Sequence, residues 1–285
     1  MTDNKMWFGT REHMQYILCP DTGADFTGVG YSSGTIQYLS GGAFIRNSDT
    51  SHREFSMSWN MGSRENLQPI FDYAAGVYGD APYYFVDPMA ADQNVLPEWW
   101  AAPRMALSDA PLLVGKTLPD KIPTPANSFG YPTSGALYTV GGSDVSNPLF
   151  IPIPPGMIFH IGVHGLGTST ASIHMSPVTA GGVGVGVDLT MLGVSSNVRF
   201  NTTQNTSGGV MGVELSVNGT GSLGLYGMIA QVLPTGITPE LGGFVGGQGH
   251  SGVTFDGKPT RMAYSSALNL MGAAVTMVET EGWVL

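Results

Sequence analysis

The stretch VDPMAADQNVLPEWWAAP, residues 86–103, holds residue types that could cleave a sugar. A glycosidase needs two carboxyl groups roughly 5 to 10 Å apart, and Asp92 and Glu98 are close enough in sequence to reach that separation. Trp99 and Trp100 follow at once, and an indole can stack on a sugar ring. In an extended chain, however, adjacent side chains point to opposite sides and cannot form one platform. Glycoside hydrolysis through Asp92 and Glu98 is therefore the minor alternative.

The same stretch is better interpreted as an interface or core segment. Its prolines stiffen the chain, so docking costs little conformational entropy. Tryptophan is also strongly enriched at the energetic centres of protein interfaces. We predict that part of this stretch contacts a neighbouring subunit, and the candidate interface residues are Asp87, Pro88, Asn94, Pro97, Trp99 and Trp100.

Three histidines, His160, His164 and His174, could suggest a metal site. Residues 157–163 alternate as a strand does, and two residues four apart on one strand face are separated by about 13 Å. A single ion cannot bridge that separation. We predict no metal or cofactor here, and histidines that face solvent.

Two glycine motifs resemble signatures of known sites without their structural context. Residues 219–224, GTGSLG, match the dinucleotide-binding fingerprint, but strands are predicted on both sides where the fingerprint needs a following helix. Residues 249–252, GHSG, lack the last glycine of a nucleophile elbow, because Val253 follows. Neither motif predicts a cofactor or a serine nucleophile.

The composition is typical of a chain whose surface is covered by neighbours. Of 285 residues, 42% are hydrophobic and 11% charged, while soluble domains average roughly 25% charged residues. The net charge of −10 provides no basic surface for phosphate, so we predict no specific nucleic-acid binding.

Charge distribution and signals narrow the class of protein further. Residues 1–125 hold 22 of the 32 charged residues, which indicates two structural zones. Cys19 is the one cysteine, so no intrachain disulfide can form. The N-terminal residues have no apolar core of a secretion signal, and no apolar run is long enough to span a bilayer. We expect a chain that folds in the cytoplasm of its host, without a membrane.

The N-terminal zone combines a strand and a helix. Residues 53–60 alternate between apolar and polar side chains, which predicts a half-buried strand. A helix is predicted over residues 63–79, with Ser63 as N-cap and Gly79 at its end. Pro69 lies inside this helix and could delay its start.

The C-terminal zone predicts a β-sandwich. Residues 116–135 are rich in proline and predict a linker. Asn218-Gly219 predicts a type I′ hairpin turn. Residues 271–285 are apolar at nearly every position and fit a buried strand or a short helix, of which the β-branched residues and Gly272 favour the strand. Several short runs alternate with period two and indicate an antiparallel sandwich of jelly-roll type; they are residues 149–153, 157–163 and 213–217.

Parts of the sequence resemble a known family. FGTREHMQYILCP, GGAFIRNSDTSHREFSMSWN and the run from DYAAGVYGDAPYYF to PEWWAAP resemble the N-terminal region of phage distal tail proteins, also called minor tail proteins of long-tailed actinobacteriophages. The resemblance extends over about residues 7–103 and, less closely, over the end segment from GGQGHSG to GWVL. PLFIPIPPGMIFHIGVHG is only loosely similar.

The resemblance implies a mainly β fold in two domains. A β-rich belt domain with one α-helix, similar to a tail-tube domain, would comprise residues 1–125 and be completed by residues 246–285. A galectin-like or carbohydrate-module-like β-sandwich would comprise residues 126–245.

The resemblance also implies a structural role at the tail tip of a virion, without catalytic residues or cofactors. Six copies would form a ring that joins the tail tube to the baseplate or fibre hub. The expected partners are other copies of the chain, the tail tube protein, the tape measure protein and other minor tail or baseplate proteins. An alternative is a tail adhesin whose β-sandwich binds a host glycan.

Overall fold

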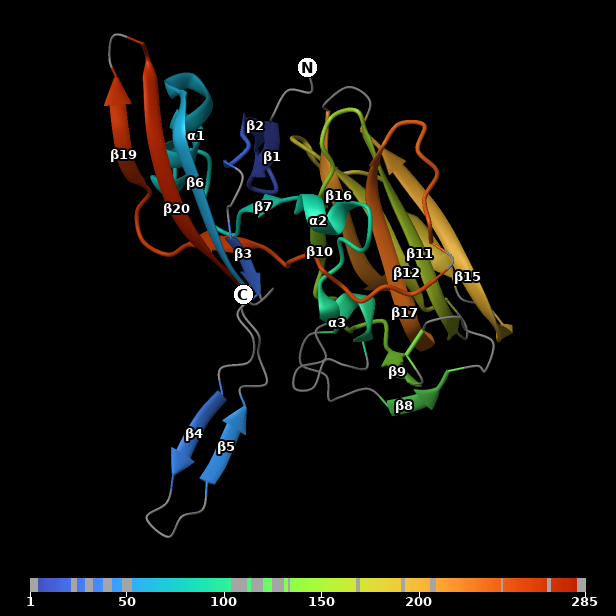
Figure 1. Cartoon of the computed structure of the whole chain (residues 1–285). Coiled ribbons are helices and arrows are strands. Elements are labelled where there is room, and N and C mark those ends of the chain that lie inside the picture. Colours follow the sequence, from blue (N-terminus) through green and yellow to red (C-terminus); the bar gives the residue numbers. More distant parts are fainter. Residues whose placement is uncertain are drawn as a thin grey trace. The chain divides into compact units, whose positions relative to one another are not determined.

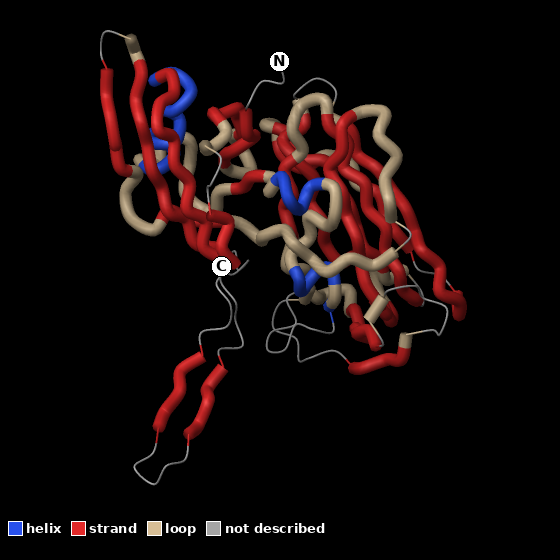
Figure 2. The backbone as a smooth tube through the Cα atoms, viewed as in Figure 1, coloured by secondary structure: helices blue, strands red, loops and turns tan. Residues whose placement is uncertain are grey.

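The computed structural model describes most of the chain in two compact units (Figures 1 and 2). Unit 1 comprises Met1–Lys5, Tyr16–Pro82 and Val253–Glu281; unit 2 comprises Met6–Gln15, Tyr83–Gly252 and Gly282–Leu285. The described residues are 5–21, 25–28, 33–37, 43–47, 53–103, 112–113, 120–124, 131–132, 134–167, 170–190, 193–205, 209–241, 243–265 and 268–280. These units have other bounds than the domains predicted from the sequence, because residues 83–103 pack within unit 2.

Unit 2 is an antiparallel β-sandwich of two facing sheets. One sheet has the order β10-β16-β12-β14, with β13 (Gly182–Val183) also paired to β12. The other has the order β15-β11-β17-β9-β8, where β8 is Asp120–Pro123. The eight main strands are β9 (Ser134–Val140), β10 (Leu149–Pro152), β11 (Met157–Gly167), β12 (Ser172–Thr179), β14 (Val187–Thr190), β15 (Gly193–Gln204), β16 (Val210–Asn218) and β17 (Gly221–Pro234).

The strand order is that of a jelly roll. When the eight main strands are numbered along the chain, one sheet reads 2-7-4-5 and the other 6-3-8-1. Successive strands therefore change sheet at each step except between β12 and β14. The predicted mainly β fold with an antiparallel sandwich is confirmed.

Two local predictions in this region are wrong. Asn218-Gly219 is a turn, but it carries the chain from β16 in one sheet to β17 in the other, so it is no hairpin. Gly219 has a φ of +83°, and a Cβ there would overlap the carbonyl oxygen of Thr170, so both backbone and packing require glycine. The predicted linker contains β8, which pairs with β9.

The core lies between the two sheets. Inward side chains of one sheet meet those of the other, and most are fully buried; they include Ile151, Ile173, Val213 and Leu215 on one side and Phe159, Ile161, Leu225 and Met228 on the other. Burying each such side chain contributes roughly 1.5–3 kcal/mol. This alternation is the period-two pattern predicted from the sequence.

Unit 1 is built around a sheet of order β18-β20-β6-β3, with β19 also paired to β20. β20 contains the first part of the strand predicted over 271–285, and residues 281–285 lie outside the described residues. β20 lies beside β6 although more than 200 residues of sequence separate them. The predicted strand over 53–60 lies in β6, with Phe55, Met57 and Trp59 buried. The bounds are β3 Asp25–Gly28, β6 Arg53–Ser63, β18 Val253–Phe255, β19 Thr260–Ser265 and β20 Leu270–Glu279.

The predicted helix is α1, Arg64–Ala74, which contacts β6 and β20. Ser63 is its N-cap, as predicted, and the Ser63 hydroxyl accepts a hydrogen bond from the backbone N–H of Asn66. Pro69 lies inside the helix without delaying its start. The helix ends earlier than predicted, in a Schellman motif with Gly76 at a φ of +74° rather than at Gly79.

Smaller elements complete the description. β1 (Lys5–Gly9), β2 (Met14–Leu18) and β7 (Tyr84–Phe85) form a three-stranded sheet, and β4 (Ser33–Gln37) and β5 (Ala43–Asn47) form a two-stranded sheet. Two four-residue helices, α2 (Pro88–Ala91) and α3 (Glu98–Ala101), follow β7. Among the described residues, the helices are too short or too polar to cross a bilayer.

Candidate functional site

The stretch from which the sequence analysis began packs on the β-sandwich of unit 2. β17 pairs with β9 only over residues 221–225, and beyond that point its edge is free for another segment. Residues 94–96 run along this edge, where the backbone N–H of Val95 donates to the carbonyl oxygen of Ala230 at 2.9 Å. The stretch therefore packs along the edge of this sheet.

Asn94 anchors this arrangement and is fully buried. Its Nδ2 donates to the carbonyl oxygens of Met228, at 3.0 Å, and Val245, at 2.7 Å. Its Oδ1 accepts from the backbone N–H groups of Leu96, at 3.2 Å, and Ala230, at 3.0 Å. One amide side chain thus uses both donor hydrogens and both acceptor lone pairs, and it joins three separate chain segments.

The tryptophan pair lies on a helical turn. α3 starts at Glu98, so the extended chain considered in the sequence analysis is wrong at this point. The rings of Trp99 and Trp100 contact each other, with centroids 5.8 Å apart and planes inclined by 50°. Trp100 is fully buried in the sandwich core, and Trp99 packs half-buried against it. For Trp100, the interpretation of this stretch as a core segment is therefore correct.

The other candidate interface residues differ in accessibility. Asn94 and Pro97 are buried, and Asp87 is 9% exposed. The side chain of Pro88 lies outside the described residues. The side chain of Trp99 is partly accessible. The interface role of the six residues stays a prediction.

The two carboxyl groups considered for glycoside hydrolysis are both exposed. Asp92 lies in the turn after α2, where its backbone oxygen accepts a hydrogen bond from the side chain of Gln231 at 2.6 Å. Glu98 is the first residue of α3. Neither residue lines the pocket nearest to this stretch.

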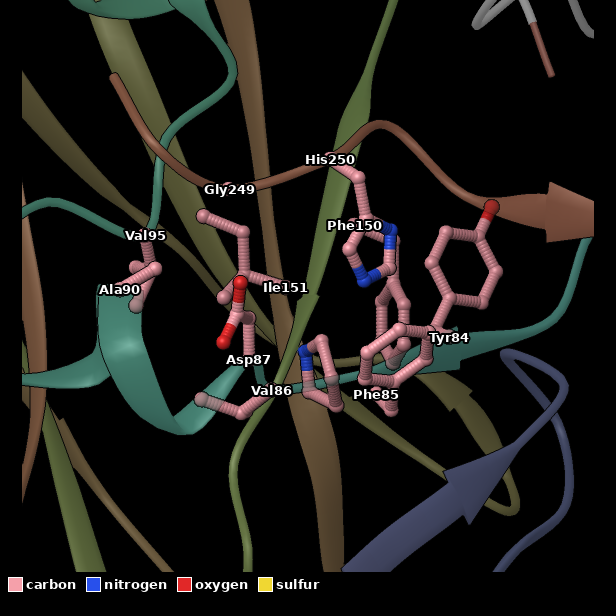
Figure 3. A pocket seen from close by; sticks show the side chains of 11 residues that line it. Tyr84, Phe85, Val86, Asp87, Ala90, Val95, Phe150, Ile151, Gly249 and His250 are labelled. Atoms are coloured by element: carbon pink, nitrogen blue, oxygen red, sulfur yellow. The ribbon is translucent and has the colours of Figure 1, made fainter. Parts of the chain in front are cut away.

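That pocket lies between β7, β10 and the chain at Gly249-His250 (Figure 3). The ring of His250 lies against Phe85, with centroids 4.4 Å apart, and both His250 and Ser251 are buried. The cavity volume is about 10 Å³, and a single water needs roughly 10–15 Å³. The pocket is therefore too small for a sugar ring, and the GHSG residues are packed inside the fold.

A different group of polar side chains lies on the outward face of the sheet that contains β12. We call it the Asp188 cluster; it comprises Ser172, His174, Asp188 and Asn218. The hydroxyl of Ser172 donates to Asp188 Oδ1 at 3.1 Å, and Nδ1 of His174 donates to the same oxygen at 2.8 Å. Asn218 Nδ2 lies 3.5 Å from it. The register explains the gathering, because His174 is paired with Asp188 and Ser172 with Asn218.

The electrostatics of this cluster keep its carboxylate charged. Burial alone would raise the pKa of Asp188, but hydrogen bonds from His174 and Ser172 and the nearby imidazole lower it below its usual value. The side chain of Asp188 is 50% exposed, so it can still accept hydrogen bonds from a hydroxyl-bearing ligand. On the same sheet Glu214 forms an ion pair with Arg11.

The sequence analysis did not identify this cluster. The signal was present in the alternation of Glu214, Ser216 and Asn218 with buried residues along β16, which marks the outward face. What the sequence lacked was the pairing that brings β14 beside β12.

The histidines that were predicted to face solvent do not all do so. His160 is 6% exposed and His164 is 2% exposed, so the prediction is wrong for both, and His174 lies half-buried in the Asp188 cluster. Additional chain covers the outward face of β11, which periodicity could not reveal. Within the described part of the chain, no three His, Cys, Asp or Glu side chains gather as a metal site would require.

Comparisons with known proteins give little similarity. No protein-family model matches the chain, and no curated protein matches it. Among solved structures, the chain is similar to the crystal structure of the enzymatically active domain of tailspike protein 4 from bacteriophage CBA120. The identity is 12% and the TM-score 0.28, over 42% of this chain and 19% of that chain. A likeness this weak supports no inference about fold or activity.

Proposed function

We propose that the protein is a structural component of a phage tail tip that assembles with copies of itself into a ring. The sequence resemblance to distal tail proteins motivates this proposal, and six copies are the expected number. The expected neighbours are the tail tube protein, the tape measure protein and other minor tail or baseplate proteins. The proposed location is the virion.

The observation that carries the proposal is the two-stranded sheet of β4 and β5. Among the described strands, these two pair only with each other. An isolated hairpin is at best marginally stable in water, so it needs a third strand or a covering surface. In the register of these two strands, Ile36 is paired with Phe44 and Thr35 with Ile45. A neighbouring subunit could provide the cover.

A ring also explains why so few residues are charged. Each subunit of a ring buries two different patches against its two neighbours. Such contacts form a closed ring when the rotation from one subunit to the next divides a full turn evenly. A chain with 11% charged residues suits a surface that assembly covers. We further propose that the protein has no catalytic activity, because neither Asp92 nor Glu98 lines the pocket beside this stretch, and that pocket is too small for a sugar ring.

The test is the mass of the protein in solution and its symmetry in cryo-electron micrographs. The double variant Ile36→Asp/Phe44→Asp is expected to stay monomeric where the parent forms a closed oligomer. Val185→Asp is the matched control, because Val185 is an exposed apolar residue in unit 2. A parent protein that remains a monomer at high concentration, or a double variant that assembles normally, contradicts the proposal.

The Asp188 cluster favours a second candidate function, binding of a host glycan by the sandwich. Carboxylate, imidazole and amide groups on an open sheet face are the groups that hold sugar hydroxyls. Asp188→Asn should then reduce binding on a glycan array, while Glu98→Gln, at an exposed carboxylate elsewhere, should not. If no glycan binds to the parent protein, the second candidate is discarded.

A further inference from the structure

The chain after β17 runs back over the outward face of its own sheet (Figure 1). We call residues 239–241 and 243–250 the strap. Leu241 is 5% exposed and lies against Gly162 of β11. Phe244 packs against Gly227 and against the ring of Tyr131, with centroids 5.3 Å apart. The strap is therefore a layer that covers one face of the sandwich.

Separate hydrogen bonds hold the strap, in place of a continuous ladder. The backbone N–H of Glu240 donates to Gln231 Oε1 at 2.9 Å, and the carbonyl oxygen of Val245 accepts from Asn94 at 2.7 Å. Gln248 donates to the carbonyl oxygen of Asn94, and Gly249 to that of Leu96, each at 3.0 Å. Such a segment can detach without breaking the strand pairing of the sandwich.

Two buried histidines lie on the covered face. His160 and His164 project from β11 on the side opposite the core residues Phe159, Ile161 and Val163. Neither ring nitrogen of His160 has a hydrogen-bond partner among the described residues. The ring of His164 lies 4.3 Å from that of Tyr131 and 5.1 Å from that of Tyr226, measured between centroids.

The surroundings offer little compensation for a positive charge. From β17, Gln231 is paired with His160, and Tyr226 contacts His164; from β15, the residue paired with His160 is Thr202. The acidic groups of the covering segments are Glu240 and Asp92, and both are exposed. Tyr131 and, within the strap itself, the buried His250 complete the set.

Burial lowers the pKa of both histidines, so both are neutral at neutral pH. In the open state each would have a pKa near 6.5. The open state therefore binds more protons than the closed state as the pH falls below that value. The closed strap keeps its full stability above about pH 6.5 and loses it progressively below.

We propose that the strap is an acid-sensitive cover: protonation of His160 and His164 opens it locally and exposes the apolar face beneath while the sandwich stays folded. The face that opening uncovers includes Gly162, Ile229 and the aromatic rings around His164. This inference does not depend on the proposed tail function.

Hydrogen exchange measured by mass spectrometry at pH 7.5 and pH 5.0, corrected for the chemical exchange rate, tests the proposal on the whole chain. The backbone amides of the strap should exchange at least roughly tenfold faster at pH 5.0. Each histidine whose protonation is suppressed in the closed state can shift the opening equilibrium of the strap by up to about tenfold per pH unit. Amides of β11 and β12 should stay protected at both pH values.

His160→Gln removes one titrating group and should reduce the pH response of the strap, and His164→Gln does the same if the first variant folds poorly. The matched control is His174→Gln in the other sheet, which should keep the full response. Equal strap exchange at both pH values overturns the proposal. So does loss of protection in the whole sandwich together, or a full response in the histidine variants that fold.

Discussion

Asn94 is a residue at which a single substitution should strongly destabilise unit 2. Replacing Asn94 with alanine removes one buried amide that links residues 96, 228, 230 and 245. All four backbone groups that it satisfies would lose this partner at once. The change disturbs the edge of β17, the stretch with the tryptophans and the strap together.

The hydrogen bonds determine the expected magnitude. A typical intramolecular hydrogen bond contributes about 0.5–1.5 kcal/mol net, so four of them amount to roughly 2–6 kcal/mol. The true value should lie in the upper half of that range, because Asn94 is fully buried and water cannot easily replace it. Whole domains are stable by only about 5–15 kcal/mol, so the loss is large.

Urea unfolding followed by tryptophan fluorescence measures this loss, because Trp100 lies in the same core. The control is Gln93→Ala, which removes one neighbouring exposed side chain whose amide oxygen accepts from Gln248. The control should cost less than about 0.5 kcal/mol.

Asn94→Asp separates hydrogen bonding from packing. Aspartate has nearly the shape of asparagine but cannot donate to Met228 and Val245, and it brings a charge into a buried site. It should therefore destabilise the protein at least as much as alanine does. If Asn94→Ala costs less than about 1 kcal/mol, or if Asn94→Asp is neutral, the structural role assigned to this side chain is wrong.

Three further outcomes are expected. Gly249→Ala would place a Cβ on the carbonyl oxygen of Val95 and should cost about 2 kcal/mol or more in urea unfolding, while Gly246→Ala, with open space around it, should be neutral. Ser63→Ala removes the N-cap of α1 and should lower the free energy of unfolding by about 1 kcal/mol, measured by thermal denaturation. Because the pKa of Asp188 is lowered in the folded state, its carboxylate stabilises the fold above about pH 4, and this stabilisation is lost as the pH falls below that value. The difference in unfolding free energy between the parent and Asp188→Asn, measured in urea titrations, should therefore shrink at acidic pH.

The elements that sequence predicted well have strong local signals. The strand over residues 53–60 follows from strict alternation, and the start of α1 follows from Ser63 and its acidic first turn. The inward positions of β10, β11 and β16 likewise follow from their period of two. In each case burial on one face requires the pattern, so the pattern reveals the face.

The errors share one physical cause, which is that long-range pairing competes with local preference. Asn218-Gly219 has the composition of a hairpin turn, yet the jelly-roll order sends the next strand to the opposite sheet. α1 ends at Ala74, and although Gly76 and Gly79 both have a positive φ, it is Gly76 that forms the Schellman motif.

The candidate sites show the same division. Asp92, Glu98, Trp99 and Trp100 attracted attention by residue type, but the fold exposes the carboxylates and buries Trp100. The Asp188 cluster has no motif, because its members come from three strands that only the sheet brings together.

The sequence by itself determined a β-rich chain with little charge, one early helix and alternating strands, because these properties depend on composition and on near neighbours. Only the tertiary structure decided which strands pair, what covers His160 and which side chains form a cluster. Those outcomes depend on contacts between residues far apart in the chain, and a local pattern carries no information about which distant segment will supply them.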